Sequence, residues 1–304
     1  MALALGHLGS RHSLRDIEAS LSTQPAQRYH LNIGPVSRSA LGRAEQLDAN
    51  FFQQLFYRLY ARCQQTHRVP GKRFRFKAKL FSLDGSLIDL SLKVFPWATV
   101  APKKAAFKLH VGLDHDGLIP AFAELTEGFE SEMAVADTFD FPPGSVLVFD
   151  RGYGRYTWHK QLSEKGLFWV TRAKAHMRYA VLEEREVTGK GGVLRDQLVE
   201  LNSARARRST LAPIRRIEYL DSDTDKRYVF ITNQMTWCAQ TVADIYKSRW
   251  EIELFFKWIK QNLKIRSFLG HSINAVASQI FVALCLYLLM AYLKFVSRTA
   301  FSVQ

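Results

Sequence analysis

Apolar side chains at helical spacing characterise the first part of the chain. Together with polar cap residues they predict three helices: 14–21 after Ser13, a segment ending at Gln46 that Ser37 or Ser39 caps, and 51–63. The first two, with Gly34-Pro35 in the loop between them, have the layout of a helix-turn-helix that reads DNA. A small helical packing module accounts for the pattern equally well. We therefore predict a small helical N-terminal domain over residues 1–68, with DNA binding as its expected role.

Beyond residue 72 the apolar spacing changes from helical to alternating, as in a strand. The apolar positions are Phe74, Phe76, Ala78 and Leu80, and the positions between them are the basic Arg73, Arg75, Lys77 and Lys79. Asp84-Gly85-Ser86 is predicted to interrupt the strands, and alternation resumes over 87–92. Asp-Gly within 114–117 favours a tight turn, because these residues tolerate positive φ, so 106–113 and 118–123 should pair as a hairpin. This part of the chain predicts an antiparallel meander.

A buried strand that ends in a carboxylate follows the meander. The elements expected there are a short helix at 131–139, a break at Pro142-Pro143-Gly144, a strand at 145–149, a helix at 156–165 and a strand at 167–171. The apolar run before Asp150 suits a central strand, covered on both faces, whose tip opens on a site. Strands and helices in this order predict an α/β layer fold, with Asp84 and Asp150 on neighbouring strands.

Polar, strand-like sequence from about 176 to 236 separates this region from the C-terminal part. It carries basic clusters at 205–208 and 215–216, and we interpret it as a mainly β insertion. Two long helices are predicted after it, at 241–263 and 274–294. With the insertion, residues 69–304 are expected to form one large domain.

The composition favours a folded protein with a polyanionic partner. The chain has 304 residues, 47% of them hydrophobic, which is enough to bury a large core. Its net charge of +14 favours nucleic acid, since neutralising phosphates releases counterions, although charge alone does not exclude an anionic membrane. The apolar run at 280–293 is short for a membrane span and predicts a buried core helix instead. We expect no membrane association.

Cysteine usage and the first residues bear on the cellular compartment. Cys63, Cys238 and Cys285 are odd in number and far apart, which argues against a disulfide framework or a Cys-rich zinc site. The N-terminal stretch lacks the charged region and long apolar core of a secretory signal. These features predict a cytoplasmic protein.

A stripe of polar side chains runs along the predicted helix at 241–263. With an advance of about 100° per residue, one narrow arc contains Tyr246, Arg249, Glu253, Lys257 and Lys260. Large apolar side chains surround this arc, which indicates that it lines a cleft or faces a bound polyanion. Ion pairs at three- and four-residue spacing on a solvated face are the simpler alternative.

The spacing within this arc matches a known signature. It reads Tyr-x2-Arg-x3-Glu-x6-Lys, at Tyr246, Arg249, Glu253 and Lys260. This resembles the sequence around the catalytic glutamate in the insertion-sequence-four family of bacterial DDE transposases. Leu83-Asp84-Gly85-Ser86 and Asp150-Arg151-Gly152-Tyr153 resemble the two aspartate motifs of that family, and 168–174 resembles the strand after the second. The resemblance covers the chain from about residue 73 onward.

The resemblance implies a ribonuclease-H-like catalytic core, with the mainly β insertion before the helix that carries the glutamate. It implies three catalytic, metal-binding carboxylates: Asp84, Asp150 and Glu253. Asp84 would bridge two Mg²⁺ ions, for which Mn²⁺ can substitute. By the same resemblance, the residues that hold DNA phosphates are Tyr246, Arg249 and Lys260. An arginine can grip a phosphate bidentately, whereas a lysine acts as a point charge.

Other candidate metal ligands have simpler explanations. Asp89 lies five residues after Asp84 and so falls on the opposite face of a regular strand. The predicted hairpin turn accounts for Asp114, His115 and Asp116. Two histidines without metal-ligand spacing are read as structural or surface residues, His110 and His271.

Three tryptophans are candidates for stacking on an unpaired base: Trp169, Trp237 and Trp250. Such side chains more often belong to the core, which is the expectation for each of them.

The resemblance implies a transposase that acts on double-stranded DNA. It would bind the terminal inverted repeats of its own element, cleave there to expose a 3′ hydroxyl, and insert that hydroxyl into target DNA. It would work as a homodimer on DNA, in the bacterial cytoplasm at the nucleoid. A metal-dependent nuclease without strand transfer is the second hypothesis. The third is a truncated, inactive DNA-binding remnant, since the chain begins inside what resembles the N-terminal domain of the family and stops soon after Lys294.

Overall fold

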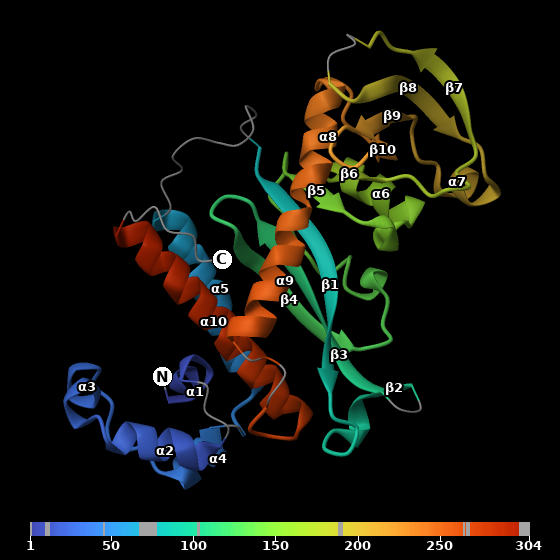
Figure 1. The fold of residues 1–304 in the computed structure, drawn as a ribbon. Helices are drawn as coiled ribbons and strands as arrows, with labels where there is room; N and C mark the ends of the chain where they lie inside the picture. The colour runs from blue at the N-terminus through green and yellow to red at the C-terminus, as the bar shows by residue number, and fades with distance from the viewer. Residues whose placement is uncertain are drawn as a thin grey trace.

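A single hydrogen-bonded sheet lies at the centre of the computed structural model, which describes residues 2–9, 13–44, 46–66, 78–101, 104–187, 191–263, 265 and 268–297. The strands within these ranges are β1 (Leu80–Leu90), β2 (Thr99–Ala101), β3 (Lys104–Asp114), β4 (Ile119–Glu127), β5 (Val146–Phe149), β6 (Phe168–Arg172), β7 (Tyr179–Glu184), β8 (Val193–Leu201), β9 (Ile214–Asp221) and β10 (Lys226–Thr232). They follow the order β2-β3-β1-β5-β6-β10-β9-β8-β7, with β4 paired to β3 (Figure 1).

Helices cover both faces of this sheet (Figure 1). The helices within the described ranges are α1 (Ala2–Leu8), α2 (Leu14–Ser22), α3 (Pro25–His30), α4 (Arg38–Ala44), α5 (Ala49–Thr66), α6 (Tyr156–Glu164), α7 (Ala204–Ser209), α8 (Ala239–Ser248), α9 (Trp250–Asn262) and α10 (Ile273–Ser297), of which α1 to α4 lie away from the sheet (Figure 1). Short 3₁₀ turns occur at η1 (Pro96–Ala98), η2 (Glu132–Ala134) and η3 (Arg151–Tyr153). The chain is a mixed α/β protein, as the alternating strand and helix patterns predicted.

The strands around β1 combine antiparallel and parallel pairing. β1 is antiparallel to β3, and β3 to β4, so the predicted meander and its hairpin are confirmed. β1 then runs parallel to β5, and β5 parallel to β6. The predicted interruption at Asp84-Gly85-Ser86 is wrong, because β1 continues through these residues while paired to β3. The basic strand residues 73–77 lie outside the described part of the chain.

Alternation along β1 and β5 separates two apolar layers. On one face, Phe81 and Phe149 pack with Trp158 of α6. On the other, Leu80 and Val148 pack beneath α8. Burial on both faces agrees with the continuous apolar sequence of β5 and with its prediction as a central strand.

The helices at the start of the chain divide into two groups. α5 packs along α10 and against β4, and its Phe56 and Cys63 belong to the same apolar cluster as α9 and α10. α2 and α4 enclose a small separate cluster with Ile17, Leu21 and Leu41 at its centre. These contacts make α5 part of the large core. The predicted boundary between residues 68 and 69 lies outside the described residues.

α10 is long and apolar enough, by length and composition, to cross a membrane. It has 25 residues and a mean hydropathy of 2.1 in its most apolar window, of which 56% is buried inside the protein. Its buried side chains pack against α5, α9 and the strands of the β1 region, so it forms part of the core. The apolar run at 280–293 is the middle of this longer helix.

Several local predictions were wrong. Residues 131–139 form only the turn η2 and further turns, because Phe139 and Phe141 are buried from an extended segment instead of a helix. The helix expected at 241–263 is two helices, α8 and α9, that meet at Arg249. A further short helix, α3, stands between α2 and the Gly34-Pro35 loop. Trp169 is fully buried as expected, whereas Trp250 is 58% exposed.

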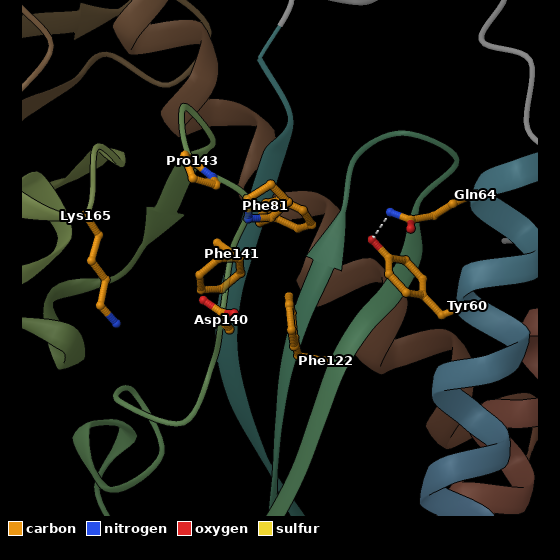
Figure 2. A pocket seen from close by; sticks show the side chains of 9 residues that line it. Tyr60, Gln64, Phe81, Phe122, Asp140, Phe141, Pro143 and Lys165 are labelled. Atoms are coloured by element: carbon orange, nitrogen blue, oxygen red, sulfur yellow. Dashed lines mark hydrogen bonds between the residues drawn. The ribbon is translucent and has the colours of Figure 1, made fainter.

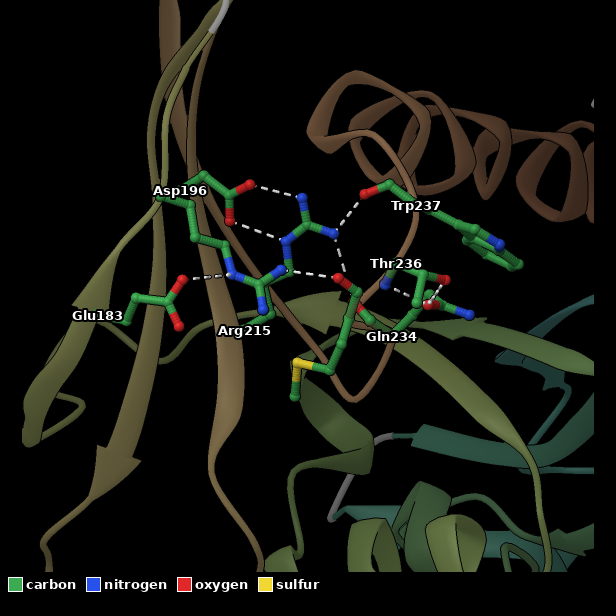
Figure 3. A network of polar contacts seen from close by, with 8 residues as sticks. Glu183, Asp196, Arg215, Gln234, Thr236 and Trp237 are labelled. Atoms are coloured by element: carbon green, nitrogen blue, oxygen red, sulfur yellow. Dashed lines mark hydrogen bonds and ion pairs between the residues drawn. The ribbon is translucent and has the colours of Figure 1, made fainter.

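A buried arginine ties the strands of the predicted insertion to the segment before α8 (Figure 3). Arg215 of β9 donates two hydrogen bonds to Asp196 of β8, at 2.8 and 2.5 Å. It also donates to the carbonyl oxygens of Gln234 and Trp237. The guanidinium and the carboxylate are both almost fully buried, and each neutralises the charge of the other. β10 in turn pairs with β6, so the insertion continues the central sheet.

We expect Asp196→Asn to lower the free energy of unfolding by about 3–5 kcal/mol, because it leaves the Arg215 charge buried without its counter-charge. Urea denaturation followed by circular dichroism measures the change. Glu164→Gln is the matched control, since it removes one charge of the exposed Lys160–Glu164 pair and should cost less than about 0.5 kcal/mol. Equal losses in the two variants would contradict the role given to Arg215.

Candidate active site

Asp84 and Asp150 stand on neighbouring parallel strands. Leu83 of β1 is in register with Phe149 of β5, so the residues that follow, Asp84 and Asp150, come next to one another along the sheet. Asp84 shares its face of β1 with Leu80, which packs under α8, because side chains two residues apart point the same way. The face of Asp84 is thus the one covered by α8 and α9.

Glu253 reaches the same face from α9. The apolar side of this helix is buried through Ile252, Phe255, Phe256 and Ile259, and the helix packs against β1. Burying that side fixes the rotation of the helix about its axis. The Glu253 side chain keeps 34% of its surface exposed and remains at the border of the core.

Arg249 joins the carboxylates at the point where α8 meets α9. Its Nη1 lies 3.6 Å from Oδ2 of Asp84, and its Nη2 donates to Oε1 of Glu253 at 2.5 Å. The guanidinium also lies over the ring of Tyr246. The Arg249 side chain is only 14% exposed, so its charge acts at short range on both carboxylates with little screening by water.

Tyr246 and Lys260 complete a line of contacts from α8 and α9 to the aspartate motifs. The Tyr246 hydroxyl donates to Oδ1 of Asp150 at 3.3 Å. Lys260 donates from Nζ to Oγ of Ser86 at 2.6 Å. All six residues singled out in the sequence therefore lie around one place on the sheet. The contact of Ser86 with Lys260 was not foreseen, although Ser86 stands in the first motif.

The electrostatics of this place are dominated by the burial of Asp84. Burial raises the pKa of Asp84 to about 6, and the charges of Glu253 and Asp150 add to the rise. Arg249 and the backbone N–H of Gly85 act against it. A carboxyl group that resists ionisation because it is buried, with like charges nearby, is typical of a site that a cation or a proton must neutralise.

The donor set suits a hard divalent cation, but its present arrangement does not enclose one. Three carboxylates offer the oxygen ligands that Mg²⁺ prefers, and the raised pKa of Asp84 reflects its burial first and the charges of Glu253 and Asp150 after it. Within the described residues, however, no three acidic, histidine or cysteine side chains stand close enough to hold one ion. Arg249 lies between Asp84 and Glu253 instead. The residue types fit a metal, and as they stand two of the three carboxylates contact Arg249.

The hairpin residues considered as rival ligands are already engaged. Asp114 is fully buried, and its Oδ2 accepts hydrogen bonds from Tyr60 and Lys79. His115 shares a hydrogen bond with Ser82. Asp89 is exposed on β1, one residue after the buried Ile88. The turn and the strand account for these residues, as expected.

A cavity of about 610 Å³ lies between α5, β1 and the segment before β5 (Figure 2). Aromatic side chains from β1 and β4 line it together with Tyr60 and Phe141. It opens on the Phe81 face of the sheet, opposite Asp84, and none of the six site residues lines it. The candidate active site is thus separate from this cavity.

Comparison with known proteins identifies relatives of one kind. Residues 75–289 match the family model described as the transposase DDE domain. The chain is 34% identical over 218 residues to y4zB, a provisionally named transposase of Sinorhizobium fredii, covering 70% of this chain and 60% of that protein. It is 26% identical over 254 residues to the probable transposase for insertion sequence element IS5377 of Geobacillus stearothermophilus, covering 83% and 65%. The chain therefore spans less than two thirds of the length of both relatives.

Solved structures also align with this chain. One of them is the piggyBac transposase synaptic complex with hairpin DNA, at a TM-score of 0.43 and 11% identity, covering 80% of this chain and 52% of that one. The likeness is too low to support a conclusion about the fold.

We expect Asp84→Asn to stabilise the protein near pH 7 in a chelating buffer. The pKa of Asp84 is raised to about 6 by burial, so its ionised form costs free energy in the folded state above that pH. The cost disappears as the pH falls below the ordinary value of 3.8, where the group is protonated in both states. The gain should be about 1–3 kcal/mol near pH 7 and close to zero near pH 4.

Urea denaturation across this pH range measures the difference, with Asp89→Asn as the control for loss of an exposed carboxylate on the same strand. If the difference in unfolding free energy between wild type and Asp84→Asn does not change with pH, the raised pKa of Asp84 is not the cause of that difference.

Proposed function

Since the chain belongs to the transposase DDE domain family, we propose that it cuts DNA at the ends of an insertion sequence and joins the freed 3′ hydroxyls to target DNA. One observation carries the proposal. Asp84 and Glu253 meet at the guanidinium of Arg249, and Asp150 follows the strand beside Asp84 and accepts a hydrogen bond from Tyr246. Carboxylates gathered in this way suit phosphoryl transfer, which depends on neutralising charge at the attacking and leaving oxygens.

The three carboxylates are the proposed ligands of two Mg²⁺ ions, with Asp84 as the shared ligand and Mn²⁺ as a substitute. When bound, the ions supply Lewis acidity and a more nucleophilic oxygen. The protein supplies the anchoring of its ligands. β1 and β5 hold the two aspartates on paired strands, and the buried side of α9 holds Glu253. Rigid strands and helices position such ligands better than loops do.

Arg249, Tyr246 and Lys260 are the proposed phosphate contacts. In the structure each is bonded to a carboxylate or hydroxyl of the aspartate motifs or to Glu253. Arg249 has the geometry to exchange its carboxylate partners for a DNA phosphate, because a guanidinium grips both kinds of anion bidentately. Lys260 offers a point charge beside Ser86. The three groups would hold the strand near the carboxylates without reading its sequence.

The strand order supports a ribonuclease-H-like core. Three antiparallel strands, β4, β3 and β1, are followed by the parallel strands β5 and β6, in the spatial order β4-β3-β1-β5-β6. We place this core within residues 69–304, with the mainly β insertion at about 176–236. Residues 1–68 are the proposed DNA-binding N-terminal domain, and its last helix, α5, packs into the core of the catalytic domain.

The proposed substrates are the terminal inverted repeats of the element and a target duplex, both double-stranded DNA. The net charge of +14 suits such polyanions. We further propose a homodimer assembled on paired DNA ends, at work in the bacterial cytoplasm at the nucleoid. A dimer would present two copies of the site, one for each end.

We expect Asp84→Asn, Asp150→Asn and Glu253→Gln each to lower metal-dependent nicking of inverted-repeat ends by roughly a thousandfold or more, because each removes one charged ligand. Labelled duplexes that carry the repeats flanking the coding region, incubated with a supercoiled plasmid and Mg²⁺ or Mn²⁺, report nicking and joining separately. Asp89→Asn is the matched control and should act like wild type.

The products separate the proposed function from its rivals. Label joined to the plasmid supports a transposase. Nicked ends that never join indicate a nuclease without strand transfer. Binding of the repeats without any nicking by the wild-type chain would show an inactive DNA-binding remnant.

A further inference from the structure

A compact group of three polar side chains lies on the opposite side of β1 from Asp84. We call it the polar support: Lys108, His110 and Glu132. In the pairing of β1 with β3, Gly85 stands opposite His110. Paired residues share a face of a sheet, so His110 and Lys108 lie on the face of Gly85, which is the reverse of the face of Asp84. Glu132 comes to the same place from the start of η2.

Two members of the polar support form an ion pair, and the third, His110, is held by a neighbouring strand. Lys108 Nζ lies 2.6 Å from Oε1 of Glu132 and donates to the carbonyl oxygen of Glu130 at 2.9 Å. His110 is fully buried and shares a hydrogen bond of 2.9 Å with Thr126. An ion pair that is mostly removed from water adds little to stability on its own, so its presence here is better explained by what it holds in place.

Both aspartate motifs press a glycine against this group. A methyl group on Gly85 would lie 3.0 Å from Cε of Lys108 and 3.2 Å from Nδ1 of His110. A methyl group on Gly152 would lie 3.0 Å from Oε2 of Glu132. Neither glycine has the positive φ that would require glycine for its backbone shape. Each glycine thus approaches one side of the polar support closely, and a larger residue there would displace it.

Tyr153 provides an independent link between the same parts. It follows Gly152, is 1% exposed, and its hydroxyl has no hydrogen-bond partner within the described residues. Burial raises the pKa of this phenol, and the charges of both Asp84 and Glu132 add to the rise. The charges of Asp84 in the first motif and of Glu132 in the polar support thus both act on Tyr153 of the second motif.

We propose that Lys108, His110 and Glu132 are positioning residues, which couple the backbone at Asp84-Gly85 to the backbone at Asp150-Arg151-Gly152 and so set how the two aspartates face a cation. Gly85 rests on the Lys108 and His110 side of the group and Gly152 on the Glu132 side. Movement of one motif is passed to the other through the Lys108–Glu132 ion pair. The inference rests on the proposed function for the identity of the ligand, but not for the coupling itself.

The coupling is tested by stability. Gly85→Ala and Gly152→Ala each displace a member of the same ion pair, so the drop in urea midpoint of the double variant should be clearly smaller than the sum of the two single drops. Gly42→Ala is the matched control, because a methyl group there meets nothing within 4 Å. Its effect should add to that of Gly85→Ala. Additive drops for Gly85→Ala and Gly152→Ala would overturn the proposal.

The positioning role is tested by Mn²⁺ titration of the folded, DNA-free chain, followed by electron paramagnetic resonance. Gly85→Ala, Gly152→Ala and Glu132→Gln should each bind Mn²⁺ about tenfold more weakly or worse, while Gly42→Ala binds as wild type does. Glu132→Gln keeps the side-chain volume and decides the matter if an alanine variant does not fold. Wild-type affinity in folded Glu132→Gln would overturn the proposal. If wild type itself binds no Mn²⁺, the metal assignment of the proposed function fails, and the midpoint test still decides the coupling.

Discussion

The parallel pairing of β1 with β5 is the constraint on which the site depends. Both strands are buried, and their register places Leu83 beside Phe149. Packing of the apolar residues fixes the two strands, and this fixes Asp84 and Asp150 next to one another. The buried side of α9 then brings Glu253 to the same region. Apolar burial, worth several kcal/mol for each large side chain pair, thus forces like charges together against their repulsion.

The positive charge of Arg249 partly offsets this repulsion. Its guanidinium stands between Asp84 and Glu253, where it replaces part of the positive charge that a cation would bring. This compensation is incomplete, since the pKa of Asp84 is still raised to about 6 by burial and by its acidic neighbours. The same arrangement explains why the described carboxylates do not enclose an ion as they stand. In the proposed function, bound cations would supply the positive charge that Arg249 leaves uncompensated.

Local patterns predicted the elements better than their exact limits or their partners. The Asp-Gly turn identified β3 and β4, and the apolar run before Asp150 identified β5. The spacing on α8 and α9 identified side chains that lie around one place on the sheet, Tyr246, Arg249, Glu253 and Lys260, because helical geometry is periodic. The helix predicted at 131–139 was wrong, because residues distant in the chain bury Phe139 and Phe141. The polar support could not be predicted from the sequence for the same reason, because no local pattern links Glu132 to Lys108.

The most direct test of the account is a crystal structure of the chain soaked with Mn²⁺, with anomalous scattering used to locate the metal. The account predicts anomalous peaks bounded by Asp84, Asp150 and Glu253, with the Arg249 guanidinium withdrawn from Asp84. Peaks elsewhere on the molecule, or a site still bridged by Arg249 at saturating Mn²⁺, would contradict the claim that these three carboxylates form the metal centre.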